Sequence, residues 1–125
     1  MEPRVLLLIE DDPDIRRVAE IALQFSEKFK VYGAGGGVEG ISLARKYKPD
    51  VILLDVMMPD LDGIETCKRL KSDPETLMIP VIFLSARSRE ESIGFGEDLG
   101  AAGFIAKPFD PLQLSNQIEK ILGLC

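Results

Sequence analysis

The sequence has 125 residues, of which 46% are hydrophobic and 29% charged, a composition typical of one folded domain rather than of a disordered or repetitive chain. Its 15 basic and 21 acidic residues give a net charge of −6 without a Lys/Arg-rich run, which argues against direct binding to nucleic acid or to an anionic membrane. Because the chain has no histidine, His-ligated metals, Ser-His-Asp and Cys-His nucleophile pairs and a phosphohistidine carrier are excluded.

The two cysteines, Cys67 and Cys125, do not make a disulfide framework, and neither a basic-then-apolar leader nor a long apolar run is present. We therefore expect a cytoplasmic protein in which residues 1–125 form a single domain without an effector domain. Cys67 lies between Ile64 and Leu70 at helical spacing, which favours a small buried side chain over a reactive thiol.

Short apolar runs alternate with segments of helical periodicity along the chain. The expected strand and helix pairs are 5–9 with 15–25, 29–32 with 38–47, 51–54 with 64–70, 81–84 with 87–99, and 104–106 with 112–122. Several of the strands are continuous apolar runs, which indicates a parallel sheet covered by helices on both faces. The pattern thus predicts an α/β fold, a single doubly wound domain of five βα units.

Polar side chains follow four of these strands, and ligands of open parallel sheets bind at the carboxyl ends of the strands. The residues concerned are Glu10, Asp11 and Asp12 after the first strand, Asp55 after the third, Ser85 after the fourth and Lys107 after the fifth. Asp12, Pro13 and Asp14 form a typical helix start, so capping explains Asp12 and Asp14. Glu10, Asp11 and Asp55 are left as the candidate functional acids.

These acids need a cation, because two carboxylates about 4 Å apart repel each other by about 4 kcal/mol at an effective dielectric near 20. Oxygen ligands from Asp11, Asp55 and a backbone carbonyl suit Mg²⁺ in a phosphoryl-transfer site. In such a site Lys107 would neutralise phosphoryl oxygens, Ser85 would donate a hydrogen bond to one, and an aspartate can be the nucleophile.

Four short motifs stand in a fixed order. They are Glu10-Asp11 after the first strand, the turn Asp55-Val56-Met57-Met58-Pro59 with Gly63, the pair Ser85-Ala86, and Gly100-Ala101 leading through Phe104 to Lys107-Pro108-Phe109. With these motifs the chain resembles, over essentially its whole length, the receiver domain of two-component response regulators, such as the single-domain chemotaxis response regulator.

The resemblance implies a flavodoxin-like (βα)5 fold with five parallel strands in the order 2-1-3-4-5. It implies Mg²⁺-dependent acceptance of a phosphoryl group by Asp55 from a histidine kinase or phosphotransfer protein, in a switch that catalyses only its own phosphorylation and dephosphorylation. A downstream protein would bind the face formed by the fourth helix, fifth strand and fifth helix. The implied site residues are Asp11, Asp55 and the Met57 carbonyl as direct metal ligands, Glu10 acting through water, Lys107 as the partner of the phosphoryl group, and Ser85 and Phe104 as switch residues.

Two features depart from the family pattern or compete with it. Met57 and Arg87 stand two residues after the acceptor and the hydroxyl, and neither offers a carboxylate or amide to align attacking water. The segment 35–40 satisfies G-x-G-x-x-G, although it follows the second strand and leaves too little chain for a dinucleotide fold. The glycine pattern nevertheless leaves a nucleotide-binding α/β domain as one alternative to a phosphorylated receiver. A receiver-like interaction module that works without phosphorylation is the other.

Overall fold

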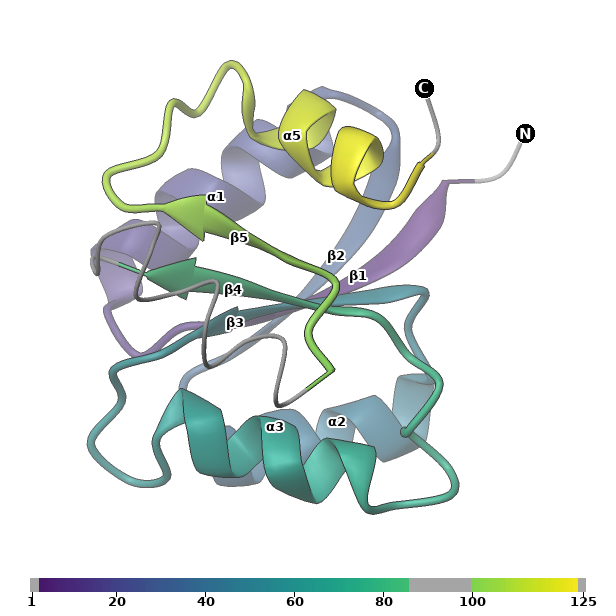
Figure 1. The fold of residues 1–125 in the computed structure, drawn as a ribbon. Helices are drawn as coiled ribbons and strands as arrows, with labels where there is room; N and C mark the ends of the chain where they lie inside the picture. Colours follow the sequence, from purple (N-terminus) through teal and green to yellow (C-terminus); the bar gives the residue numbers. More distant parts are fainter. Residues whose placement is uncertain (1–2, 86–99, 124–125) are drawn as a thin grey trace.

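The computed structural model describes residues 3–85 and 100–123, and its centre is one five-stranded parallel sheet in the order β2-β1-β3-β4-β5 (Figure 1). The strands are β1 (Arg4–Ile9), β2 (Phe29–Ala34), β3 (Val51–Asp55), β4 (Val81–Ser85) and β5 (Gly103–Ala106). This order reverses direction between β1 and β3, so the carboxyl ends of these two strands border the crevice in which ligands of such sheets bind. The predicted strand order is confirmed.

Four helices of the described residues cover the sheet on both faces (Figure 1). They are α1 (Pro13–Phe25), α2 (Gly37–Tyr47), α3 (Gly63–Lys71) and α5 (Leu114–Ile121). Side chains of β1 alternate between two cores, since Leu6 and Leu8 pack with α1 and α5 while Leu7 and Ile9 pack with α2 and α3. Burial on both faces explains why β3 and β4 are continuous apolar runs.

The ends of the elements follow local hydrogen bonding. Asp12 caps α1 as expected, because its Oδ1 accepts from the backbone N–H groups of Asp14 at 2.9 Å and Ile15 at 3.2 Å. The last helix begins at Leu114 rather than at residue 112, because Asp110 holds a turn in which its Oδ1 accepts from the N–H of Leu112 at 2.9 Å. The expected helix over 87–99 lies outside the described residues, as does Arg87.

Two other expectations concern burial and membrane crossing. Cys67 is fully buried in α3, and burial raises the pKa of its thiol above the ordinary value, which confirms a packing role over a reactive one. Across residues 3–85 and 100–123, no helix combines the length and the apolar content that a membrane crossing requires.

Candidate functional site

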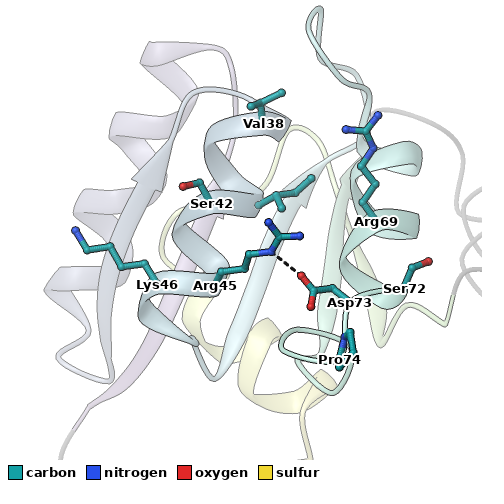
Figure 2. Close-up of a pocket in the computed structure, with 9 residues that line it drawn as sticks. Val38, Ser42, Arg45, Lys46, Arg69, Ser72, Asp73 and Pro74 are labelled. Atoms are coloured by element: carbon teal, nitrogen blue, oxygen red, sulfur yellow. Dashed lines mark hydrogen bonds and ion pairs between the residues drawn. The ribbon is translucent and has the colours of Figure 1, made fainter.

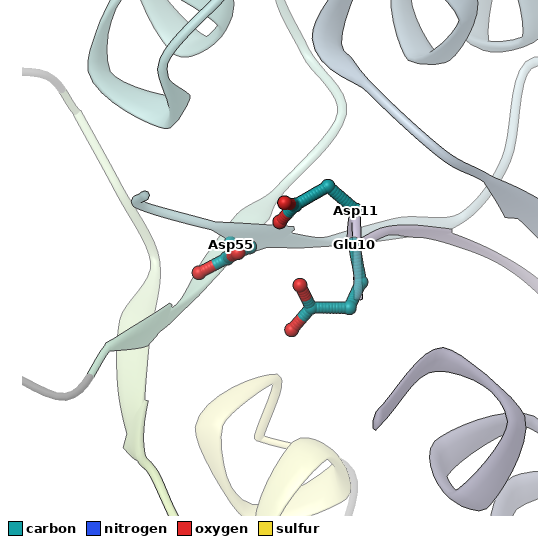
Figure 3. A group of neighbouring side chains, drawn as sticks. All are labelled: Glu10, Asp11 and Asp55. Atoms are coloured by element: carbon teal, nitrogen blue, oxygen red, sulfur yellow. The ribbon is translucent and has the colours of Figure 1, made fainter. Parts of the chain in front are cut away.

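Three carboxylates meet at the carboxyl ends of β1 and β3 (Figure 3). One carboxylate oxygen from each of Glu10, Asp11 and Asp55 lies within 4.8 Å of the others. Glu10 is fully buried and Asp55 is buried at the end of β3, while Asp11 is half-buried. The sheet therefore brings together acids that are far apart in the sequence, at the crevice where the strand order reverses.

Lys107, which directly follows β5, provides the positive charge of this cluster. Its Nζ lies 3.0 Å from Oδ1 of Asp55 and 2.5 Å from Oε1 of Glu10. Burial lowers the pKa of Lys107, but its contacts with these two carboxylates outweigh burial and hold the pKa above its ordinary value. Lys107 thus contacts two of the three carboxylates, and the acids of the cluster outnumber this one ammonium.

Glu10 carries the clearest sign of this excess. Burial, followed by the neighbouring Asp55 carboxylate, raises the pKa of Glu10 to about 7, although Lys107 lowers it. Its Oε1 is buried and lies against the Lys107 ammonium, while its Oε2 accepts from the Asp12 N–H at 3.3 Å. The donor set of Glu10, Asp11 and Asp55 is entirely oxygen and includes more acids than Lys107 contacts, which fits a hard divalent cation.

The segment after β3 is folded tightly against the end of that strand. The Met57 N–H donates to Oδ1 of Asp55 at 3.3 Å, and the Gly63 N–H donates to the Val56 carbonyl at 2.8 Å. A Cβ at Gly63 would lie 2.1 Å from the Asp55 carbonyl oxygen, so only glycine permits this close approach. The first residues of α3 therefore restrain the loop in which Met57 stands, with its side chain 67% exposed.

Ser85 and Phe104 lie on the neighbouring strands β4 and β5. Ser85 is the buried last residue of β4, and its carbonyl accepts from the Lys107 N–H at 2.9 Å. Phe104 is half-buried and its ring stacks on that of Phe83, with centroids 5.8 Å apart. Ser85 thus stands beside Lys107 at the same edge of the sheet as the acids, whereas Phe104 lies within β5.

Arg16 is a contributor to the site that sequence reasoning missed. It lies in α1, and its Nη1 donates to the Glu10 carbonyl at 2.7 Å, which ties the backbone that follows β1 to this helix. A basic residue shortly after the Asp12 cap was the signal that could have identified it.

A hollow between α2 and α3 is separate from this cluster (Figure 2). Its lining includes Val38, Arg45, Arg69 and Asp73, and none of the predicted site residues. Within it Nε of Arg45 donates to Oδ2 of Asp73 at 2.6 Å. The hollow is therefore a place where two helices meet rather than part of the acidic site.

Comparison with known proteins identifies the family. The model of the response regulator receiver domain matches residues 6–119, which is nearly the whole chain. This chain belongs to the response regulator receiver family. The receiver domain's cluster of Glu10, Asp11 and Asp55 fits the phosphoacceptor site expected of that family.

Individual relatives agree with this assignment. The chain is 38% identical to the transcriptional regulatory protein AfsQ1 of Streptomyces coelicolor over 94% of its own length and 50% of that protein. Among solved structures, the chemotaxis protein CheY4 of Vibrio cholerae is similar with a TM-score of 0.88 at 28% identity, covering 95% of this chain and 98% of that one. A putative response regulator from Chloroflexus aurantiacus has a TM-score of 0.87 at 31% identity, covering 97% and 98%. The receiver spans about half the length of the curated relatives that it matches.

Proposed function

We propose that this receiver accepts a phosphoryl group on Asp55 in a Mg²⁺-dependent reaction, with a histidine kinase or a phosphotransfer protein as the donor. The observation that carries the proposal is the meeting of three carboxylates within 4.8 Å, with Lys107 3.0 Å from the Asp55 carboxylate. An excess of negative charge at a strand-end crevice is a poor site for a further anion unless a cation is bound, and phosphoryl-transfer sites of this kind use Mg²⁺.

Each site residue has a part in the proposed reaction. Asp11, Asp55 and the Met57 carbonyl would hold Mg²⁺ directly and Glu10 would hold it through water, and the ion would neutralise charge that develops on the transferred phosphoryl group. An Asp55 carboxylate oxygen attacks phosphorus, the bond from phosphorus to the donor atom breaks, and the electron pair leaves with the donor. Lys107 pairs with the new phosphoryl oxygens and the Ser85 hydroxyl donates to one of them.

The signal would then leave through a protein partner. A phosphoryl group adds about −1.5 to −2 charges, which must bias an element with two arrangements to have an effect. We propose that Ser85 moves toward the phosphoryl group and that Phe104 repacks in response, which alters the face formed by β5 and α5. The domain would work in the cytoplasm and catalyse only its own phosphorylation and dephosphorylation.

The test is incubation with acetyl phosphate and MgCl₂, followed by intact-mass measurement. Wild type should gain one phosphoryl group, and both Asp55→Asn and added EDTA should abolish the gain. Asp12→Asn is the matched control, because asparagine also caps a helix and Asp12 lies outside the acidic cluster. Labelling of Asp55→Asn equal to that of wild type would refute the acceptor assignment. A wild type that gains no mass would favour the interaction module that works without phosphorylation.

A further inference from the structure

The glycine-rich segment before α2 has a structural partner in the loop that follows the acceptor strand. The N-cap of α2 is Gly36, which has no side chain to cap the first N–H groups of the helix. Asp60, on the β3–α3 loop, supplies the missing carboxylate: its Oδ1 accepts from Gly37 N–H at 3.3 Å and its Oδ2 from Val38 N–H at 3.4 Å. The carboxylate of one loop therefore caps a helix that begins more than twenty residues earlier.

The fit between the two segments depends on a glycine. A Cβ at Gly36 would lie 2.6 Å from Oδ2 of Asp60, a distance at which something must shift. The φ of Gly36 is −171°, which any residue adopts, so a larger side chain here would displace the Asp60 carboxylate without straining the backbone. Gly36 occupies a variable position of the G-x-G-x-x-G pattern, and two of the pattern's own glycines are explained by packing, because a Cβ at Gly37 would collide with Thr66 and one at Gly40 with Ile9.

Charge and neighbouring contacts strengthen the cap. Backbone N–H groups of Leu61, Gly37 and Val38 lower the pKa of Asp60 below its ordinary value, so the carboxylate stays ionised at the positive end of α2. The Thr66 hydroxyl of α3 donates to the carbonyls of Leu61 at 3.3 Å and of Asp62 at 2.8 Å. The loop is consequently held by α3 on one side of Asp60, and Asp60 itself holds it to α2.

We propose that Asp60 is a positioning residue for phosphoryl acceptance: by capping α2 it holds the β3–α3 loop, and with it Met57, beside Asp55. The inference rests on the proposed function, in which the Met57 carbonyl is a ligand of Mg²⁺. Met57 is largely exposed, and its backbone N–H reaches Oδ1 of Asp55 at 3.3 Å, a contact that depends on where the loop lies. Without the Asp60 cap the loop would sample other positions, and the metal would be bound by fewer ligands at a time.

The primary test is a Mg²⁺ titration by calorimetry, because the chain has no tryptophan to report metal binding by fluorescence. Asp60→Ala should bind Mg²⁺ roughly tenfold more weakly, the low end of the effect of groups that orient metal ligands. Phosphorylation by acetyl phosphate should be slow at limiting MgCl₂ and return toward the wild-type rate at saturating MgCl₂. Asp60→Asn retains one acceptor oxygen and should give an intermediate affinity.

Two further variants separate positioning from general stability. Gly36→Ala leaves Met57 and Asp60 of the β3–α3 loop unchanged, but its added methyl group crowds Asp60. It should therefore weaken Mg²⁺ binding in the same way as Asp60→Ala. Asp73→Ala is the matched control, because Asp73 pairs with Arg45 at the other end of the hollow between α2 and α3 (Figure 2), away from the acids. It should leave Mg²⁺ affinity at the wild-type value, and circular dichroism checks that each variant is folded.

The outcomes distinguish the two proposals. Wild-type Mg²⁺ affinity in Asp60→Ala, or an equal loss in Asp73→Ala, would overturn the positioning role while phosphorylation of wild-type Asp55 still stands. A wild type that neither binds Mg²⁺ nor gains a phosphoryl group would refute the proposed function and this inference together.

Discussion

Replacing Asp11 by asparagine should stabilise the metal-free receiver and reduce what the protein gains from Mg²⁺. The substitution removes one negative charge from a cluster in which Lys107 contacts Glu10 and Asp55. Asparagine keeps the size of the side chain, so the change is mainly electrostatic.

The magnitude follows from the spacing of the carboxylates. At 4.8 Å and an effective dielectric of 20, two unit charges repel by about 3.5 kcal/mol. Only the repulsion between Asp11 and Asp55 is counted, because the pKa of Glu10 is raised to about 7 and its carboxyl is partly protonated at neutral pH. Asp11 is half-buried, so solvent screens this interaction and we expect a stabilisation of about 1–2 kcal/mol.

Bound Mg²⁺ should stabilise wild type more than Asp11→Asn. At a free concentration a hundredfold above its Kd, an ion that binds only the folded state adds about 2.7 kcal/mol to stability. A variant that binds a hundredfold more weakly for want of one ligand gains only about 0.4 kcal/mol under the same conditions. The difference in stability between the two proteins should therefore move by about 2 kcal/mol in favour of wild type.

Urea unfolding followed by circular dichroism, in EDTA and in saturating MgCl₂ at low ionic strength, measures both effects. Asp12→Asn serves as the control, because it keeps a capping oxygen on α1 and should unfold like wild type in both buffers. An Asp11→Asn protein that is less stable than wild type in EDTA would refute the electrostatic reasoning. An undiminished gain from Mg²⁺ would refute direct ligation by Asp11.

Two more predictions concern pH and signal output. In EDTA and between pH 4.5 and about 7, the folded state holds a proton on Glu10 that the unfolded chain releases. The contribution of Glu10 to the free energy of unfolding is therefore fully present below pH 4.5 and is lost as pH rises to about 7. The loss amounts to at most about 3 kcal/mol. Glu10→Gln should remove that part of the pH dependence of urea unfolding, and identical pH profiles for the two proteins would contradict it. Beryllofluoride, a stable mimic of the phosphoryl group, should change amide hydrogen exchange in β5 and α5; changes confined to residues 56–62 would argue against an output face there.

Much of the site could be predicted because its residues stand at strand ends. A continuous apolar run followed by acids marks the carboxyl end of a buried parallel strand, and such ends share one edge of the sheet. The distinction between Asp11 and Asp12 was also local, since Asp12 precedes Pro13 and Asp14 in a helix start and the structure shows its carboxylate capping α1. Helix ends were predicted less well, because the turn made by Asp110 competes with the helical pattern at Leu112.

The amino-acid sequence by itself determined the alternation of strands and helices, the family and the candidate acids, because these depend on periodicity and on short motifs. Only the tertiary structure decided that one ammonium, Lys107, contacts both Glu10 and Asp55, because that contact requires β5 to lie on the far side of β4 from β3. The hydrogen bonds that Asp60 accepts from Gly37 and Val38 beside Gly36 were equally out of reach. In the sequence Asp60 is an ordinary turn residue and Gly36 one of several loop glycines, and a helix cap supplied from another loop becomes visible only when packing brings the two segments together.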